Sequence, residues 1–240
     1  MTKEAPADPG ADLGFTLRSL ARAARAGSLA TITNAGQPFV SLVTPAFDAG
    51  CTPLLLLSGL SEHTRHLRVE PRCALLITGA ANGPNPQTTP RVTLIGRATP
   101  IEDAALRARY LAIHPYAALY AGFGDFALWR LTVEEAHYVG GFGLARHVTQ
   151  AKLLPAPEAV AAIAAAEPEI IAEANAERAV SERIVAIDLD GCDIAEDDAT
   201  RRLTFPAPAA SPETVRAALR HVAPQKTRGA RPEQARGENS

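Results

Sequence analysis

The stretch from Pro53 to Thr78, PLLLLSGLSEHTRHLRVEPRCALLIT, constrains the fold of this chain more than any other. It contains two apolar runs of strand length, Pro53 to Leu57 and Cys73 to Ile77, which predict two buried strands. A polar turn and a short helix separate the runs, and Ser61 is the candidate N-cap of that helix. We therefore expect a buried strand, a turn, one short helix and a second buried strand.

The turn in this stretch gathers hydroxyl and basic groups where the helix begins. Ser58, Ser61, His63, Thr64 and Arg65 fall within eight positions. Free backbone N–H groups and the positive end of the helix dipole would point at the same place. The pattern is typical of an anion site, most simply for a phosphate. The alternative is an ordinary capped helix whose polar residues are solvated.

The segments before and after this stretch predict an antiparallel β architecture. A helix from Leu13 to Ala26 would end at Gly27, and three strands would follow as a meander. Farther on, the Thr99-Pro100-Ile101-Glu102 segment predicts a capping box that starts a helix ending near His114. The expected strands are 28–33, 38–47, 53–57, 73–77, 91–99, 126–133 and 136–139. Many short strands with few helices favour a closed or split antiparallel barrel.

Pro155 and Pro157 mark a boundary, after which the pattern becomes a small α+β module. Two alanine-rich helices separated at Pro168, a hairpin of 184–188 with 201–205, and a final helix capped at Ser211 are expected. The predicted fold class is thus mainly β plus α+β, with a split β-barrel at 12–150 and an α+β domain at 155–223. Residues 1–11 and 224–240 are expected to be flexible tails.

The bulk composition excludes several classes of protein. A formal net charge of -2 with interspersed charges gives no footprint for nucleic acid. No apolar run approaches the ~20 residues of a membrane span, and the N-terminus lacks a signal-peptide core, so a cytoplasmic location is expected. The 3 cysteines are far apart in sequence, which indicates neither a zinc site nor a disulfide framework.

Four segments carry a resemblance to a known family: PFVSLVTPAF, LLLLSGLSEHTRHLRVEPRCALLI, PRVTLIGRATPI and GFGDFALWRLTVEEAHYVGGFG. The chain resembles the FMN-binding split-barrel proteins related to pyridoxamine 5'-phosphate oxidase. It is most similar to their haem-utilisation (HugZ-like) branch, which continues into a C-terminal α+β domain. The resemblance implies an FMN-dependent oxidoreductase, or a non-catalytic flavin-binding protein, that forms a homodimer with FMN at the subunit interface. The substrate would be a small molecule that the sequence does not identify.

The resemblance assigns expected contacts to the cofactor. The FMN phosphate falls to the turn residues Ser58, Ser61, His63, Thr64 and Arg65, and a dianionic phosphate suits an arginine fork and hydroxyl donors. The flavin ring and the remaining cofactor contacts fall to Val40, Ser41, Leu42, Thr44 and Arg91. Trp129 and Tyr138 are expected either to cover the flavin across the dimer or to belong to the core.

Two departures from the family affect the expected reaction. Leu144 stands where the oxidase has a substrate-binding arginine, so oxidation of pyridoxamine phosphate is not expected. The C-terminal domain lacks the branch's histidine-rich motif, which leaves His221 as the haem-ligand candidate for a second hypothesis, a haem-binding or haem-degrading protein. His221 could equally be a surface residue. His63 and His66 have no third metal ligand nearby in sequence, and DLDGCDIAEDD is interpreted as a solvated turn rather than a calcium loop.

Overall fold

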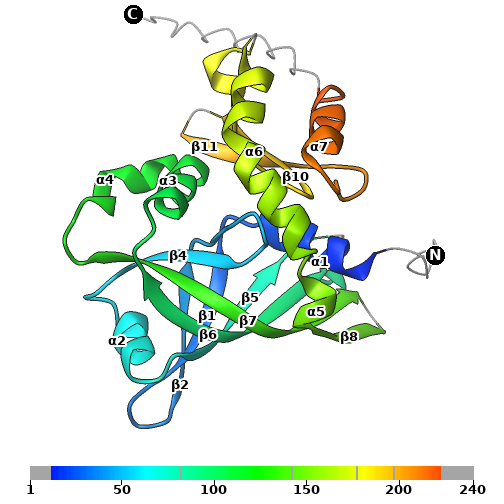
Figure 1. Ribbon diagram of the computed structural model, residues 1–240. Helices are drawn as coiled ribbons and strands as arrows, with labels where there is room; N and C mark the ends of the chain where they lie inside the picture. The colour runs from blue at the N-terminus through cyan, green and yellow to red at the C-terminus, as the bar shows by residue number, and fades with distance from the viewer. Residues whose placement is uncertain (1–11, 82, 142, 177, 197, 223–240) are drawn as a thin grey trace, which may run out of the picture.

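The computed structural model describes residues 12–222 except 82, 142, 177 and 197 (Figure 1). The expected flexible tails at 1–11 and 224–240 lie outside the described residues. The helices are α1 (Leu13–Ala23), α2 (Glu62–Val69), α3 (Ala104–Ile113), α4 (Ala118–Ala121), α5 (Gln150–Leu153), α6 (Pro157–Asn175) and α7 (Pro212–Leu219). Short 3-10 turns lie at Pro86–Thr88, Pro115–Ala117 and Val180–Glu182. In this part of the chain, no helix is long and apolar enough to cross a membrane.

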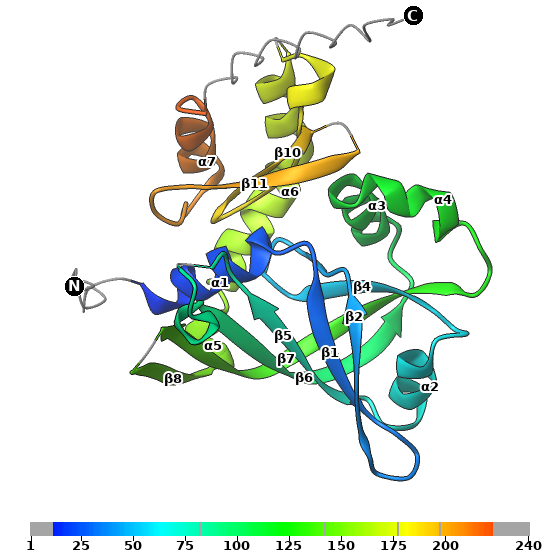
Figure 2. The ribbon, with the colours of Figure 1, turned by 180° about the vertical axis from the view of Figure 1, so that it is seen from behind.

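Eight strands form one antiparallel sheet that curls into a barrel (Figures 1 and 2). They are β1 (Gly27–Ile32), β2 (Pro38–Val43), β3 (Ala46–Phe47), β4 (Pro53–Ser58), β5 (Arg72–Thr78), β6 (Arg91–Ile101), β7 (Phe126–Gly141) and β8 (Leu144–Thr149). The order is β2-β1-β5-β6-β7-β4-β3, with β8 beside β7. The predicted split β-barrel is therefore confirmed.

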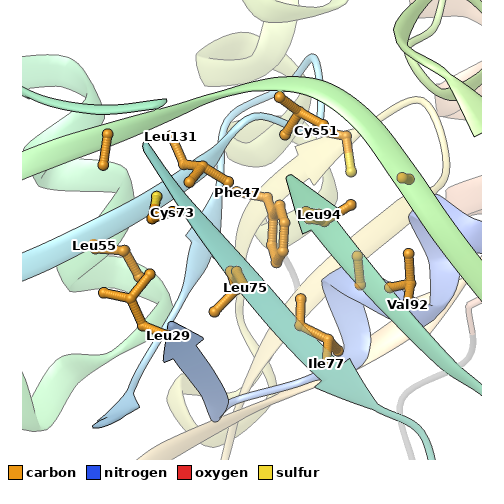
Figure 3. Packing of buried hydrophobic residues seen from close by; sticks show 14 of the residues in the cluster. Leu29, Phe47, Cys51, Leu55, Cys73, Leu75, Ile77, Val92, Leu94 and Leu131 are labelled. Atoms are coloured by element: carbon orange, nitrogen blue, oxygen red, sulfur yellow. The ribbon is translucent and has the colours of Figure 1, made fainter. Parts of the chain in front are cut away.

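The barrel interior is filled by one side of each strand. Leu29, Leu75 and Leu94 lie opposite one another on β1, β5 and β6, and none is more than 1% exposed. Figure 3 shows these side chains meeting Phe47 and Leu131 in the core. Burial therefore alternates along these strands, and one side of each strand faces the barrel interior.

The expected three-stranded meander is wrong. β2 pairs only with β1 among the described strands, whereas β4 pairs with β7 and with the short β3. Pro45 lacks the N–H that would continue a ladder, so the expected 38–47 strand divides into β2 and β3. The apolar residues of β4 are at most 8% exposed, and such a strand belongs between two neighbours rather than at an edge.

Several element boundaries also differ from the sequence prediction. Gly27 is the first residue of β1 and not a helix cap, because α1 already ends at Ala23. The predicted capping box at Thr99 lies inside β6, and the Asp103 side chain caps α3 instead by accepting from Leu106 N. The two strands expected at 126–139 are one strand, β7. A bulge opposite Ile95 and Gly96 interrupts its alternation.

The C-terminal part has its own sheet and its own hydrophobic core. Strands β9 (Ile184–Asp188), β10 (Gly191–Glu196) and β11 (Ala199–Thr204) form an antiparallel sheet in the order β11-β10-β9. Its core includes Ile163 and Ile170 of α6 and Val215 of α7. The sequence prediction missed β10, and it divided α6 at Pro168, which the structure places inside one continuous helix. The predicted cap is present, because Ser211 and Thr214 form a capping box at α7.

Candidate functional site

The turn between β4 and α2 is built as the sequence predicts. Ser61 is the N-cap residue of α2, and its carbonyl accepts hydrogen bonds from the backbone N–H groups of Thr64 and Arg65. The turn is held from the other side because Gly59 N donates to Asp125 O at 2.7 Å. The five predicted phosphate contacts therefore gather around one helix N-terminus.

The side chains of this turn are partly engaged with one another. Arg65 Nη1 pairs with Glu62 Oε1 at 2.5 Å, and both side chains are 56% exposed. Ser58 Oγ donates to Asp125 Oδ2 at 2.5 Å. The Ser61 side chain makes no capping bond, and the hydroxyl of Thr64 is buried without a hydrogen-bond partner among the described residues. Two hydroxyls can thus serve a ligand here, whereas Ser58 and Arg65 would first have to change partners.

Two histidines of α2 point back toward the strands. Ser41 Oγ and His63 Nδ1 are 3.0 Å apart, and Thr31 Oγ1 and His66 Nδ1 are 3.1 Å apart. Burial, and next the neighbouring His66, lower the pKa of His63. His63 is therefore neutral near pH 7 and adds no positive charge for a phosphate. Arg68, which the sequence reasoning overlooked, lies against Gly59 and brings a second guanidinium to the turn.

The predicted ring contacts on β2 do not share one face of the sheet. Ser41 lies on the inward side opposite Leu29, whereas Val40 and Leu42 point outward and are 62% and 76% exposed. Thr44 is farther along the chain, where its hydroxyl and Tyr110 Oη are 2.9 Å apart. The structure thus brings Ser41 together with the turn, and places Val40 and Leu42 on a separate surface.

The remaining candidates lie apart from the turn. Trp129 and Tyr138 belong to the barrel core, 2% and 7% exposed, and burial raises the pKa of Tyr138. Both residues were expected either to cover the flavin across a dimer or to belong to the core. Their positions fit the second alternative. Arg91 is held at the start of β6, where its Nη1 donates to Gln87 O and Thr89 O. His221 is exposed and follows α7 in the C-terminal part.

The aspartate run DLDGCDIAEDD is not a solvated turn, so that prediction is wrong. Asp188, Asp190 and Asp193 are at most 3% exposed. Arg18 of α1 forms a two-point contact with Asp190, with both N–O distances at 2.9 Å. Arg22, one helical turn further, pairs with Asp188 at 3.0 Å. The carboxylates are buried because arginines from the barrel helix neutralise them.

This buried charged cluster has further members in both the barrel and the C-terminal part. The pairs of Arg25 and Arg109 tie the C-terminal part to the barrel, whereas those of Arg202 lie within the C-terminal sheet. The additional ion pairs are Arg25–Asp193, Arg109–Glu167, Arg109–Asp188, Arg202–Asp188 and Arg202–Asp193. No group of three or more His, Cys, Asp or Glu residues that could hold a metal ion occurs in the described part of the chain.

The outward side of the sheet forms a continuous surface across six strands, which we call the outer face. One row of residues runs straight across it, because each register pairs neighbouring members: Leu42, Ser28, Leu76, Thr93, His137 and His147. A parallel row contributes Val40, Ala30, Ala74 and Ile95. The outer face is therefore mainly apolar on β1, β2 and β5, and ends in two histidines on β7 and β8.

The two histidines form a pair that the sequence reasoning did not identify. His137 and His147 are directly opposite in the antiparallel ladder, with ring centroids 4.8 Å apart. The signal was present in the sequence, because the glycine-rich GGFG segment at 140–143 is a turn signal between the two histidines. It was missed because the second strand, β8, was not predicted.

The curled antiparallel sheet, with a helix-capped turn at one end, defines a protein of the split-barrel class. The model of the family described as "CREG, beta-barrel" matches residues 15–154, and the chain belongs to this family.

Relatives extend this similarity. A chloroplastic heme oxygenase of Arabidopsis thaliana, HOZ, is 37% identical over 134 residues, which are 54% of this chain and 40% of the plant protein. Less than half of the plant protein's length is therefore matched. Two solved structures resemble both parts of the chain. One is the protein Atu2129 of Agrobacterium tumefaciens, of unknown function, with TM-score 0.74, 25% identity, and coverage of 90% of this chain and 97% of that one.

The other structure is a heme binding protein from Mycobacterium smegmatis. Its TM-score is 0.56 at 28% identity, and the match covers 86% of this chain and 93% of that one. Relatives with haem in their names thus match about half of this chain in one case and most of it in the other.

Proposed function

We propose that this protein binds haem and acts as a haem-handling member of its split-barrel family. The observation that carries the proposal is the similarity to the mycobacterial heme binding protein, which extends over both the barrel and the C-terminal part. The 37% identity to the plant heme oxygenase, over 54% of this chain, supports it as well. This gives the haem hypothesis more support than the flavin oxidoreductase hypothesis that the sequence favours.

The residues present suit a flat apolar ligand that carries acidic groups and an iron. The outer face offers an apolar strip, two imidazoles and the guanidinium of Arg91. Proteins hold haem iron most often through a neutral histidine, and pair acidic groups with arginine. Bound haem would supply an iron centre for oxygen or electron chemistry, while the chain supplies orientation and exclusion of water.

Titration with haemin tests this proposal directly. We expect the purified protein to shift the Soret band of haemin and to saturate at one haem per chain. Haemin diluted into the same buffer without protein gives the baseline spectrum. A haemin spectrum that stays unchanged up to a fivefold excess of protein would contradict the proposal.

FMN binding at the β4–α2 turn is a second candidate, with or without catalysis, because one observation favours it. The hydroxyl of Thr64 is buried without a partner at a helix N-terminus, where a phosphate oxygen could accept from it. Ser61 and Arg68 would add a hydroxyl and a cation. FMN would supply the electron-transfer chemistry, and these residues would only hold its phosphate.

Flavin fluorescence quenching tests the second candidate. If the turn binds the phosphate, Thr64→Val should weaken FMN binding about tenfold, because a hydrogen bond to a charged group is worth about 1.5–3 kcal/mol. Arg65→Ala should weaken it as well. Thr132→Val, an exposed substitution on β7, is the control and should bind FMN as the wild type does. Wild-type protein that leaves FMN fluorescence unquenched would exclude this candidate.

A further inference from the structure

The N-terminus of α2 contains hydrogen-bond donors that find no acceptor within the described part of the chain. Glu62 and His63 are the first two residues of the helix, and no acceptor is within hydrogen-bond distance of their backbone N–H groups. The hydroxyl of Thr64, which is 1% exposed, also lacks a partner. Helical side chains lean toward the N-terminus of their helix, so this hydroxyl and the two N–H groups are directed to the same end. An anion bound there would satisfy all three.

His63 belongs to the same helix end, and histidine is the residue type that changes its charge near neutral pH. Its Nδ1 is 3.0 Å from Ser41 Oγ of β2. A hydroxyl can both donate and accept a hydrogen bond, so Ser41 can donate to a neutral His63 and accept from a protonated one. The contact with Ser41 therefore holds the ring in either charge state.

In the chain without a ligand, the surroundings keep His63 neutral. Burial, and next the neighbouring His66, lower its pKa. The positive end of the helix dipole also disfavours a cation in the first turn. A phosphate with two negative charges at this helix end would act in the opposite direction, because a nearby opposite charge favours the charged form of a histidine.

The elements around α2 contribute no other group whose charge changes near neutral pH. The helix packs against β1, β2 and β6, and the first two strands carry no ionisable side chain. The charged residues nearby are arginines and carboxylates, which keep their charge in this range. They are Arg91 and Arg97 of β6, Glu134 paired with Arg97, Glu70 paired with Arg72, Arg68 against Gly59, and Asp125, which accepts from Ser58.

His66 is the other histidine of α2, and its contacts differ from those of His63. It lies in the second turn, where its Nδ1 is 3.1 Å from Thr31 Oγ1 and its Nε2 is 3.9 Å from Glu62 Oε2. Its ring is therefore engaged with β1 and with the side chain of Glu62. Glu62 in turn pairs with Arg65. His63 is thus the histidine that shares the first turn with the unsatisfied donors.

We propose that His63 recognises a dianionic phosphate at the N-terminus of α2 by taking up a proton from solvent when the anion binds. This inference rests on the second candidate function, FMN binding at the β4–α2 turn, and names the residue that makes the turn select the phosphate. The site should therefore prefer FMN to riboflavin, which has the same ring without the phosphate. Affinity for FMN should rise as the pH falls, down to about pH 6, where the phosphate itself begins to be protonated.

Isothermal titration calorimetry of the full-length protein with FMN tests the proposal, because proton uptake makes the measured heat depend on the buffer. At pH 7, in buffers of different ionisation enthalpy, the wild type should take up about 0.5–1 proton more than His63→Asn. The variant keeps a polar group toward Ser41, and should bind FMN about three- to tenfold more weakly with a flatter pH dependence. His147→Asn, an exposed histidine substitution on β8, is the matched control and should behave as the wild type does. Circular dichroism would verify that each variant is folded.

The outcomes separate the role of His63 from the function it rests on. FMN binding whose heat does not depend on the buffer would overturn the proposal and leave FMN binding standing. Equal proton uptake in the wild type and His63→Asn, or its loss only in His66→Asn, would also overturn it, because another group would then take up the proton. A wild type that gives neither heat nor fluorescence quenching with FMN would overturn the candidate function, and the proposal with it.

Discussion

At the scale of single residues, the buried carboxylates of the C-terminal part are the groups on which stability depends most. Asp188 is fully buried and contacts three arginines: Arg22, Arg109 and Arg202. Burial by itself would raise the pKa of its carboxyl, but the arginines outweigh burial and hold the pKa at about 2. Asp188 is therefore ionised throughout the physiological range.

This pKa predicts how stability depends on pH. Because the pKa of Asp188 is lower in the folded chain than the ordinary value of 3.8, its contribution is complete above about pH 4. The contribution is lost as the pH falls from there toward 2. Asp188→Asn should lower the free energy of unfolding at pH 7 by about 3–5 kcal/mol, because it leaves buried arginines uncompensated. It should also flatten the dependence between pH 4 and 2, measured by urea denaturation.

Glu173→Gln is the matched control for that measurement. Glu173 also pairs with an arginine, Arg216, but the pair is exposed on the surface of the C-terminal part. Its substitution should change stability little, since exposed ion pairs are screened by water and salt. Equal effects of the two substitutions would contradict the role given to burial.

Predictions for single residues were correct where the groups that decide the outcome are close in sequence. Cys73 begins an apolar run that predicts a buried strand, and it is buried, with a pKa raised to about 12 by desolvation. Ser61 is the N-cap that was expected. The buried aspartates were misread because their partners are distant: Arg18 and Asp190 are 172 positions apart. No pattern within a local window identifies such a pair.

At the scale of elements, β2 is the strand that most needs a partner. It lies at one end of the sheet order, and its outward residues Val40 and Leu42 are 62% and 76% exposed. An exposed apolar edge strand invites association with another chain. We therefore keep the expected homodimer as a proposal and place its contact at β2.

The oligomeric state tests this placement. Wild-type protein should sediment as a dimer, and Leu42→Asp should shift it toward the monomer, because a charge would then lie in an apolar contact. Leu119→Asp on α4, where the side chain is 81% exposed, is the control and should leave the dimer intact. A wild type that sediments as a monomer at all concentrations tested would rule the dimer out. An unaffected Leu42→Asp dimer would move the contact elsewhere.

Strands were predicted correctly where buried and exposed residues alternate without a break, and incorrectly where a single residue breaks the alternation. The burial of Val92, Leu94, Gly96 and Ala98 follows a period of two along β6, as an unbroken strand requires. In β7, the bulge opposite Ile95 and Gly96 inserts one residue, so the local pattern reads as two strands. Pro100 was expected to start a helix, yet it is exposed at the end of β6, a position where a strand tolerates proline.

At the scale of the whole molecule, the buried charged cluster joins two parts that have separate cores. We propose that 12–150 and 155–223 are domains in the sense of separate cores, as the sequence predicts. The contact between them is not a loose one, since Arg18 and Arg22 of α1 are at most 4% exposed and both reach Asp190. Separating the parts would leave charges unpaired on each side.

The cluster therefore predicts that the two parts unfold together. Trp129, the only tryptophan of the chain, is buried in the barrel core and reports on the barrel alone. Asp190→Ala lies in the other part, yet it should lower the denaturation midpoint seen by Trp129 fluorescence, because Arg18 of the barrel helix loses its two-point partner. The midpoint from far-ultraviolet circular dichroism should fall by the same amount, as one cooperative transition requires. Glu173→Ala, in the same part but paired within it, should leave the fluorescence midpoint unchanged. If Asp190→Ala instead produces an early circular dichroism transition while Trp129 keeps its wild-type midpoint, the parts are independent and the cluster does not couple them.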